Sequence, residues 1–282
     1  DPSSDTFSPG GLIDRVDNRD YRWSEIGGAA QFKWEDGFDA EKNVQAALQQ
    51  PTFKIPVKDQ AQSSSCGGMA WAYLAEILEA LNTGTYEPRS AKYVYAQTYQ
   101  AGGGSTGRDN AAIFGSQGVC KESLLTSAPA TEAFLTRGQD IMDSHRENAK
   151  FAKAFPYVST GTNLDAIGSA MGMNSGVILL VNGANNGTWG SENPQPPTSV
   201  AWRHWLLACK ARINNGVRQV GVINSWGPMI GAGGWQWLSE NYFTTGNVLS
   251  GWTHVFAPVP PPPGFHHVFN TDLRQGMSGP EI

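Results

Sequence analysis

Residues 58–71 read KDQAQSSSCGGMAW, and they place a single cysteine among residues with small side chains. Three serines (63–65) precede Cys66, and two glycines (67–68) follow it. The role of a thiol among such small side chains is therefore the first question that the sequence raises.

Apolar side chains recur at three- and four-residue steps after Cys66, which predicts an amphipathic helix over 66–81. These residues are Ala70, Tyr73, Leu74, Ile77, Leu78 and Leu81. The sequence Asn82-Thr83-Gly84 supplies a helix end, and the three serines offer N-cap oxygens at the start. Cys66 would then lie in the first turn, where free N–H groups and the helix dipole favour the thiolate. The alternative role is a small buried filler, because free cysteine is among the most buried residue types.

The chain has three cysteines, so at least one thiol stays free. Cys120 and Cys209 could form a disulfide or remain two buried thiols. We favour the second arrangement, because Cys209 lies in a predicted buried strand. No Cys/His pair has the spacing of zinc ligands, so we expect no metal and no cofactor.

Composition indicates a loop-rich globular protein. Of 282 residues, 40% are apolar and 16% are charged, with 33 glycines and 17 prolines. The net charge of −5 disfavours a nucleic-acid partner, and no apolar run approaches the ~18 residues of a membrane span. The chain starts at Asp1 without a signal peptide and carries ten tryptophans, so we expect a processed, secreted or extracytoplasmic protein.

The first part of the chain reads as helical and the second part as sheet-rich. Helices are predicted at 39–49, 66–81, 88–100, 109–117 and 164–171, and strands at 176–182, 203–212, 217–224, 234–238 and 252–257. This order argues for an α+β fold with two lobes that meet at a cleft.

Three further stretches identify a known pattern. Gln60 precedes Cys66 by six residues, and RHWLLA (203–208), INSWG (223–227) and GAGGWQWL (231–238) follow later. In these features the sequence resembles the papain-like cysteine peptidases, in a divergent, bacterial-type form, over about residues 50–257. The resemblance implies a helical lobe whose central helix starts at the nucleophile, a β-barrel-like lobe, and a cleft between them.

The resemblance also assigns a role to each motif residue. Cys66 would attack a peptide carbonyl as thiolate, and His204 would hold the ion pair and protonate the leaving amine. Asn224 would orient the imidazole, and Trp226 would cover the Asn–His hydrogen bond. The side-chain amide of Gln60 and the backbone N–H of Cys66 would form the oxyanion hole.

Other residues compete for these roles or depart from the pattern. The remaining histidines, none of which is followed by an NSWG-like motif, are His145, His254, His266 and His267. Gly67 and Gly68 stand where the family has an aromatic residue directly after the nucleophile, and they could let a substrate backbone approach. Ser63 replaces a cysteine that usually forms a disulfide, and Arg203 replaces a small residue before the histidine.

The loop AGGGSTG (101–107) falls where the family places the glycines of the substrate cleft. Gly103 and Gly104 could bind a substrate backbone there, or the loop could simply be flexible.

Three segments are expected along the chain: an extension (1–50), the peptidase domain (51–257), and a polyproline stretch with a tail (258–282). The extension is shorter than the family's inhibitory pro-segments, and we expect part of it either to lie across the cleft, as in a zymogen, or to act as a surface strap. The termini could also bind partner proteins.

The leading functional prediction is a cysteine endopeptidase that acts on peptides or proteins through a thioester acyl-enzyme. A catalytically silent papain-fold subunit is the alternative. A Cys–His amidase acting on cell-wall peptides is a weaker one, because Gln60 and the NSWG motif point away from it.

Overall fold

The computed structural model describes residues 9–18, 20–26, 32–153 and 156–255. The predictions made for the polyproline stretch, the tail, His266 and His267 lie outside these residues. In chain order the elements are β1 (Gly11–Leu12), α1 (Trp23–Ile26), β2 (Phe38–Asp39), α2 (Ala40–Leu48), α3 (Cys66–Thr83), α4 (Ala91–Thr98), β3 (Ser105–Thr106), α5 (Gly107–Ser116), α6 (Glu132–Leu135), η2 (Gly138–Asp140), α7 (Asp143–Ala149), η3 (Lys150–Ala152), β4 (Tyr157–Ser159), α8 (Leu164–Asn174), β5 (Val177–Gly183), η4 (Thr188–Gly190), β6 (Trp202–Asn214), β7 (Val217–Ile223), β8 (Trp235–Ser239), α9 (Glu240–Thr244) and β9 (Val248–His254).

The helix predicted after Cys66 is confirmed. α3 begins at Cys66 and ends at Thr83, and Gly84 adopts the left-handed conformation (φ 67°) that terminates it. The expected serine cap is wrong: Ser65 is the N-cap but makes no side-chain cap hydrogen bond. Its hydroxyl instead contacts the Ser63 hydroxyl, which donates to the carbonyl of Gln60. The serines therefore organise the loop before the helix rather than cap it.

The second half of the chain forms an antiparallel sheet with strand order β4-β9-β5-β6-β7-β8, and the short β2 pairs with β6. Within the described residues no pairing joins β4 to β8, the two ends of this strand order. Long hairpins explain its regularity: β6 pairs with both β5 and β7 over most of its length.

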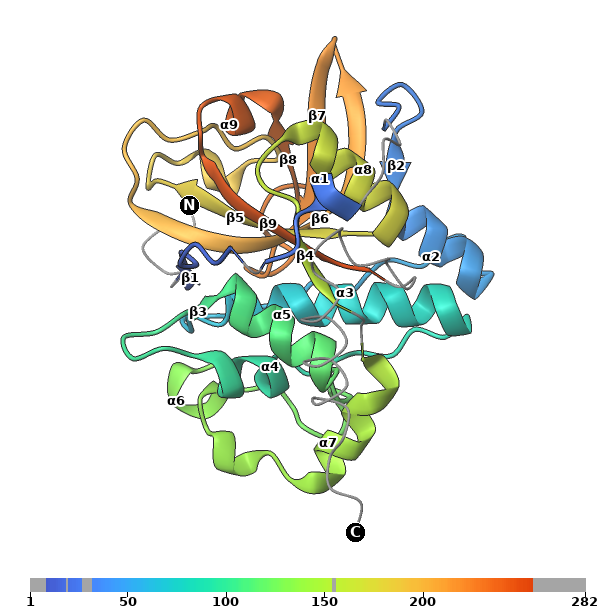
Figure 1. The fold of residues 1–282 in the computed structure, drawn as a ribbon, viewed down its shortest axis with the longest axis vertical. Coiled ribbons are helices and arrows are strands. Elements are labelled where there is room, and N and C mark those ends of the chain that lie inside the picture. The colour runs from blue at the N-terminus through green and yellow to red at the C-terminus, as the bar shows by residue number, and fades with distance from the viewer. Residues whose placement is uncertain (1–8, 19, 27–31, 154–155, 256–282) are drawn as a thin grey trace.

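Two layers of apolar side chains cover the two faces of this sheet, as the alternation in β5 shows. Ile178 and Leu180 pack with α3, whereas Leu179 and Val181 pack with the side of α8. Because both faces are covered, all seven residues of β5 are buried. In Figure 1 the helices α3, α4, α5, α6 and α7 gather below the sheet, which gives the two lobes that the sequence predicted.

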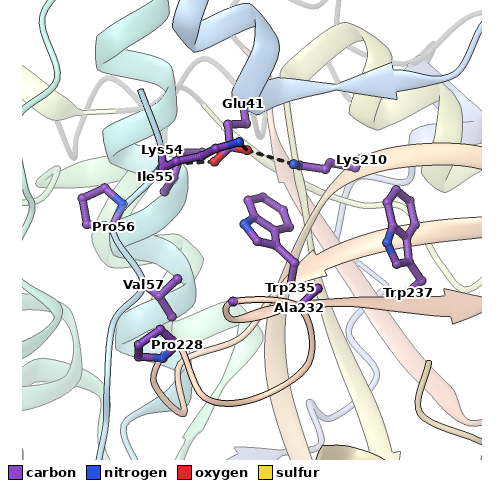
Figure 2. A pocket seen from close by; sticks show the side chains of 11 residues that line it. Glu41, Lys54, Ile55, Pro56, Val57, Lys210, Pro228, Ala232, Trp235 and Trp237 are labelled. Carbon is purple, nitrogen blue, oxygen red and sulfur yellow. Dashed lines mark hydrogen bonds and ion pairs between the residues drawn. The ribbon is translucent and has the colours of Figure 1, made fainter. Parts of the chain in front are cut away.

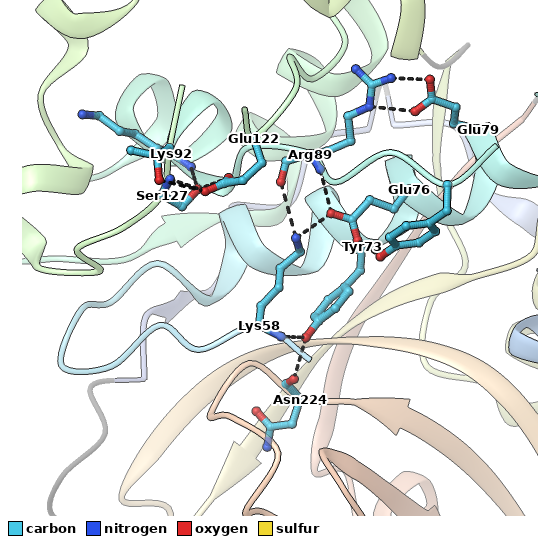
Figure 3. A network of polar contacts seen from close by, with 11 residues as sticks. Lys58, Tyr73, Glu76, Glu79, Arg89, Lys92, Glu122, Ser127 and Asn224 are labelled. Carbon is cyan, nitrogen blue, oxygen red and sulfur yellow. Dashed lines mark hydrogen bonds and ion pairs between the residues drawn. The ribbon is translucent and has the colours of Figure 1, made fainter. Parts of the chain in front are cut away.

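Several features of the structure were not predicted from the sequence. β9 begins at Val248, four residues before the predicted start, because Val248–Gly251 pair with β5. α6 and α7 were not predicted, since four and seven residues are too few to show a helical period. The buried carboxylate of Glu76 in α3 also lacked a sequence signal; it accepts hydrogen bonds from Lys58, Tyr86 and the N–H of Arg89 (Figure 3).

Within the described residues, no helix is both long and apolar enough to cross a membrane. The same residues contain no group of three or more His, Cys, Asp or Glu side chains placed to hold a metal ion. All three cysteines are free and buried, as favoured from the sequence for Cys120 and Cys209.

Candidate active site

Cys66 is fully buried at the start of α3. Its Sγ accepts a hydrogen bond from the N–H of Gly10, 3.3 Å away, and a second backbone N–H comes from Trp205, the residue after His204. Burial nevertheless raises the pKa of the thiol to about 11. In this covered arrangement Cys66 is therefore a neutral thiol at pH 7.

His204 lies near the start of β6 and is also fully buried. Its Nε2 lies 2.9 Å from Oδ1 of Asn224, while Nδ1 has no hydrogen-bond partner among the described residues. Burial lowers the pKa of His204 to about 4, against the opposing effect of the Asn224 hydrogen bond. The imidazole is neutral at pH 7, and one of its nitrogens is left for another task.

Asn224, directly after β7, is held on all sides. Its Nδ2 donates to Oε1 of Gln236 (2.8 Å), and its Oδ1 also accepts from the N–H of Ser225 (2.7 Å). The hydroxyl of Tyr73 donates to its carbonyl (3.0 Å), which ties it to α3 (Figure 3). These bonds fix which end of the amide faces His204. Gln236 had no sequence signal beyond its place in the aromatic strand after the glycine turn.

Trp226 stacks on His204, with ring centroids 4.3 Å apart and planes 30° apart. Trp202 and Trp189 pack around it at centroid distances of 5.3 and 5.9 Å. Trp226 therefore lies directly over the imidazole, and the other two tryptophans pack against Trp226. Trp189 and Trp202 were not predicted from the sequence. Trp189 lies in the long polar loop before β6, where no motif marks it.

Gln60 is buried beside the nucleophile loop. Its Nε2 donates to the carbonyl of Ser63 (2.8 Å), and its Oε1 accepts from the hydroxyl of Ser225 (2.7 Å). The backbone N–H of Gln60 also donates to the carbonyl of Ser225. These bonds join the side chain of Gln60 to the loop before Cys66 and to the segment after Asn224.

Gly67 and Gly68 lie in close packing behind the nucleophile. A Cβ on Gly67 would stand 2.4 Å from the side chains of Ser105 and Asn110, and one on Gly68 would stand 2.6 Å from the carbonyl of Ala91. They therefore allow α3 to approach β3 and α4 closely. The predicted approach of a substrate backbone to these two glycines stays a prediction. No room exists here for the aromatic residue of the family pattern.

The glycine loop meets the extension at Cys66. Gly102, Gly103 and Gly104 all have positive φ (95°, 93° and 86°), which explains the run of glycines. The N–H of Ser105 donates to the carbonyl of Gly10 (2.9 Å), and β1 continues in parallel along β3. A Cβ on Gly104 would stand 2.4 Å from that carbonyl, so Gly104 permits the approach.

After β1, polar contacts hold the extension against the rest of the protein. The carboxylate of Asp14 accepts hydrogen bonds from the N–H groups of Gly107 and Arg108 and from the indole of Trp252. Arg108 forms an ion pair with Asp20, and the carbonyl of Tyr21 accepts from the N–H of Ser159. The described residues of this segment thus contact the thiol at Gly10 and the edge of the sheet at Tyr21.

Neither of the other two described histidines has a comparable arrangement. Nδ1 of His145 accepts a hydrogen bond from the N–H of Met142 at the start of α7. Nε2 of His254 accepts one from the indole of Trp71, within the core below the sheet. Both contacts are structural.

Figure 2 shows the side chains that line a pocket, whose volume is about 580 Å³. Trp235 and Trp237 line it with Pro56, Val57 and Pro228, and the ammonium group of Lys210 lies 3.8 Å from the centre of the Trp235 ring. The buried carboxylate of Glu41, which also lines the pocket, accepts hydrogen bonds from the ammonium groups of Lys54 and Lys210 and from the N–H of Ile55. None of the predicted site residues lines this pocket.

The pKa of His204 predicts an acid-sensitive fold. A pKa that is lowered from 6.5 to about 4 gives stability that is present above pH 6.5 and lost as the pH falls through 4. We expect the free energy of unfolding to fall by roughly 3 kcal/mol between pH 7 and pH 4 from this residue. Urea unfolding at both pH values measures it. His204→Gln should lose less stability on acidification than the wild type, whereas exposed Arg203→Gln should lose the same amount; equal losses in all three would contradict the prediction.

Comparison with solved structures defines the class of fold. The chain has the papain-like fold, with 18% sequence identity and a TM-score of 0.69 to xylellain, a cysteine protease from Xylella fastidiosa, over 88% of this chain and 96% of that one. No protein-family model and no curated protein matches the sequence.

Two eukaryotic structures show the same likeness. One is the digestive procathepsin L 3 of Tenebrio molitor (16% identity, TM-score 0.64, 84% of this chain and 74% of that one). The other is the bromelain protease of Ananas comosus in complex with the E64 inhibitor (17% identity, TM-score 0.59, 78% and 99%). At these identities the likeness establishes the fold, and the chemistry rests on the site itself.

Proposed function

We propose that the protein is a cysteine endopeptidase that uses Cys66, His204 and Asn224 as a catalytic triad. The observation that carries the proposal is the buried bond from Nε2 of His204 to Oδ1 of Asn224, stacked under Trp226. It leaves Nδ1 of His204 unpaired among the described residues, on the strand whose next N–H reaches the Cys66 sulfur. An imidazole held by one nitrogen and placed beside a thiol is suited to take and return a proton.

In the reaction, His204 takes the proton of the Cys66 thiol, and Sγ attacks the carbonyl carbon of the peptide. The oxyanion accepts hydrogen bonds from the Cys66 N–H and from Nε2 of Gln60. When the C–N bond breaks, the imidazolium gives its proton to the leaving amine, and the acyl group stays on Sγ as a thioester. Water, deprotonated by His204, then attacks the thioester, which releases the acid and restores the thiol.

We also propose that the described residues of the extension from 9 to 18 and from 20 to 22 hold the enzyme in a latent state. The backbone of Gly10 occupies the position over Sγ, and Gly11 lies so close to β6 that a Cβ would stand 3.0 Å from the N–H nitrogen of His204. Burial under this segment keeps both partners neutral, because the pKa of Cys66 is about 11 and that of His204 about 4. Substrates that compete for this place must first displace the extension.

The alternative function is a silent papain-fold subunit. The close packing of Gly67 and Gly68 is compatible with it, since no substrate needs to reach them. It does not explain why a neutral imidazole is held by Asn224 and covered by three tryptophans. The extracytoplasmic location stays a prediction from the sequence.

Labelling with a peptidyl epoxide separates the two functions. We expect the full chain to be alkylated at Cys66, slowly because of the extension, and not at the buried Cys120 and Cys209, as read by peptide mass mapping. Cys66→Ala serves as the control and should abolish labelling. A folded chain that is never alkylated at Cys66, even after the extension has been displaced, would favour the silent subunit.

A further inference from the structure

Glu132, at the start of α6, lies directly behind the residues that precede the nucleophile. Its Oε2 accepts a hydrogen bond from the N–H of Ser64 (2.7 Å), two residues before Cys66. Its Oε1 accepts one from the hydroxyl of Tyr95 (2.6 Å), which in turn accepts from the N–H of Gly104 (2.9 Å). The carboxylate thus joins the loop before Cys66 to the glycine loop.

Gly103 lies against Ser64 and close to the carboxylate of Glu132. A Cβ on Gly103 would stand 2.9 Å from Oγ of Ser64 and 3.7 Å from Oε1 of Glu132, whereas one on Gly102 would meet nothing within 4 Å. Because residue 103 is a glycine, it has no side chain that would cover Ser64 and Glu132, and these two residues form a polar wall beside Gly103. In Figure 1, α6 lies beside the chain between α4 and β3.

This wall belongs to the acyl side of the scissile bond. The leaving amine receives its proton from His204, so the leaving group lies toward β6, and the acyl group lies on the other side of Sγ, toward Ser64 and Gly103. The extension marks the same position. A Cβ on Gly10 would stand 1.8 Å from the Ser64 carbonyl oxygen, so the chain over Sγ is pressed against this wall.

The charge of Glu132 is not neutralised by an ion pair with any Lys or Arg in the described part of the chain. Burial and the bond to Glu132 raise the pKa of Tyr95, so its hydroxyl stays a donor to the carboxylate. Each carboxylate oxygen accepts one hydrogen bond from the groups named above and has capacity for a second.

We propose, on the basis of the peptidase function above, that Glu132 is a specificity-determining residue that selects a lysine or arginine as the residue whose carbonyl is attacked. A guanidinium or ammonium group that passes Gly103 would complete the hydrogen bonds of the carboxylate and neutralise its charge. The substrates would then be basic peptides or proteins, in keeping with the net charge of −5.

The test compares two peptidyl acyloxymethyl ketones that differ only in arginine or leucine next to the reactive carbonyl. The second-order rate constants for alkylation of Cys66 are measured by mass spectrometry on the full chain. Because displacement of the extension slows both probes equally, their ratio reports the wall alone. We expect the wild type to prefer arginine, and Glu132→Gln to lower the arginine-to-leucine ratio by about tenfold or more.

Glu122→Gln is the matched control. Glu122 also anchors a loop through its carboxylate, by accepting from the N–H and hydroxyl of Ser127, but it does not contact Ser64 or the glycine loop. We expect its ratio to equal that of the wild type. If Glu132→Gln slows both probes equally, or changes neither, Glu132 only positions Ser64 and the proposal is wrong.

A third probe with citrulline in place of arginine tests the charge without any substitution. The wild type should alkylate about tenfold more slowly with citrulline, which has nearly the same shape but no charge. Equal rates would overturn the proposal even if Glu132→Gln did not fold. If no probe labels Cys66, with the extension in place or displaced, the peptidase function itself fails, an outcome distinct from a lost preference.

Discussion

Replacing His204 with alanine is expected to lower kcat/KM for peptide hydrolysis by about a thousandfold or more. Without the imidazole, nothing removes the proton from a thiol whose pKa burial raises to about 11, and nothing protonates the leaving amine. The measurement is hydrolysis of a fluorogenic peptide, with active-site concentration set by Cys66 alkylation in the wild type.

The matched control for this substitution is Arg203→Ala, one residue earlier on β6 and exposed. Its kcat/KM should stay within a few fold of the wild type if the loss of activity in His204→Ala comes from the missing imidazole. A His204→Ala protein that is folded and retains more than a tenth of the wild-type kcat/KM would remove His204 from the triad.

Replacing Gly10 with leucine is expected to activate the full chain. Any Cβ at this position would stand 1.8 Å from the Ser64 carbonyl oxygen and 2.8 Å from its Cβ, so the extension cannot keep its place over Sγ. Overlaps of this kind cost about 1–3 kcal/mol, which corresponds to a rise of about tenfold or more in the uncovered fraction. The rate of Cys66 alkylation by the peptidyl epoxide should rise by the same factor.

Val16→Leu is the control for this variant, because Val16 lies in the same extension but is 92% exposed. Its labelling rate should match the wild type. An unchanged rate in Gly10→Leu would show that the extension does not limit access, and the latent state proposed above would be abandoned.

Much of the architecture was predictable because it depends on periodic burial. α3 follows from apolar steps of three and four residues, and β5 from a continuous apolar run that both core layers require. Gly84 predicted the end of α3, because glycine readily adopts the left-handed conformation found there. The start of β9 was misplaced, because Ser250 and Gly251 carry no strand signal and pair with β5 only in the folded chain.

The candidate site was predictable only where motif spacing carried it. The expected hydrogen bond between His204 and Asn224 is present, and the catalytic roles of Gln60, Cys66, His204 and Asn224 stay predictions. Gln236, Trp189 and Glu132 act through contacts made across the fold, at sequence separations of 12, 37 and 68 residues from their partners Asn224, Trp226 and Ser64. Long-range contacts of this kind leave no local pattern, so no reading of the sequence alone could find them.

The hydroxyl of Tyr73 has a mechanical consequence. It accepts from the N–H of Lys58 and donates to the carbonyl of Asn224, while the Lys58 ammonium is bound to Glu76 one turn further along α3. Buried, hydrogen-bonded groups thereby connect α3 to the end of β7, and such groups stabilise this contact between the two elements. These bonds join the two lobes close to the thiol. In the latent state proposed above, access to Cys66 therefore depends on displacement of the extension and not on a hinge between the lobes.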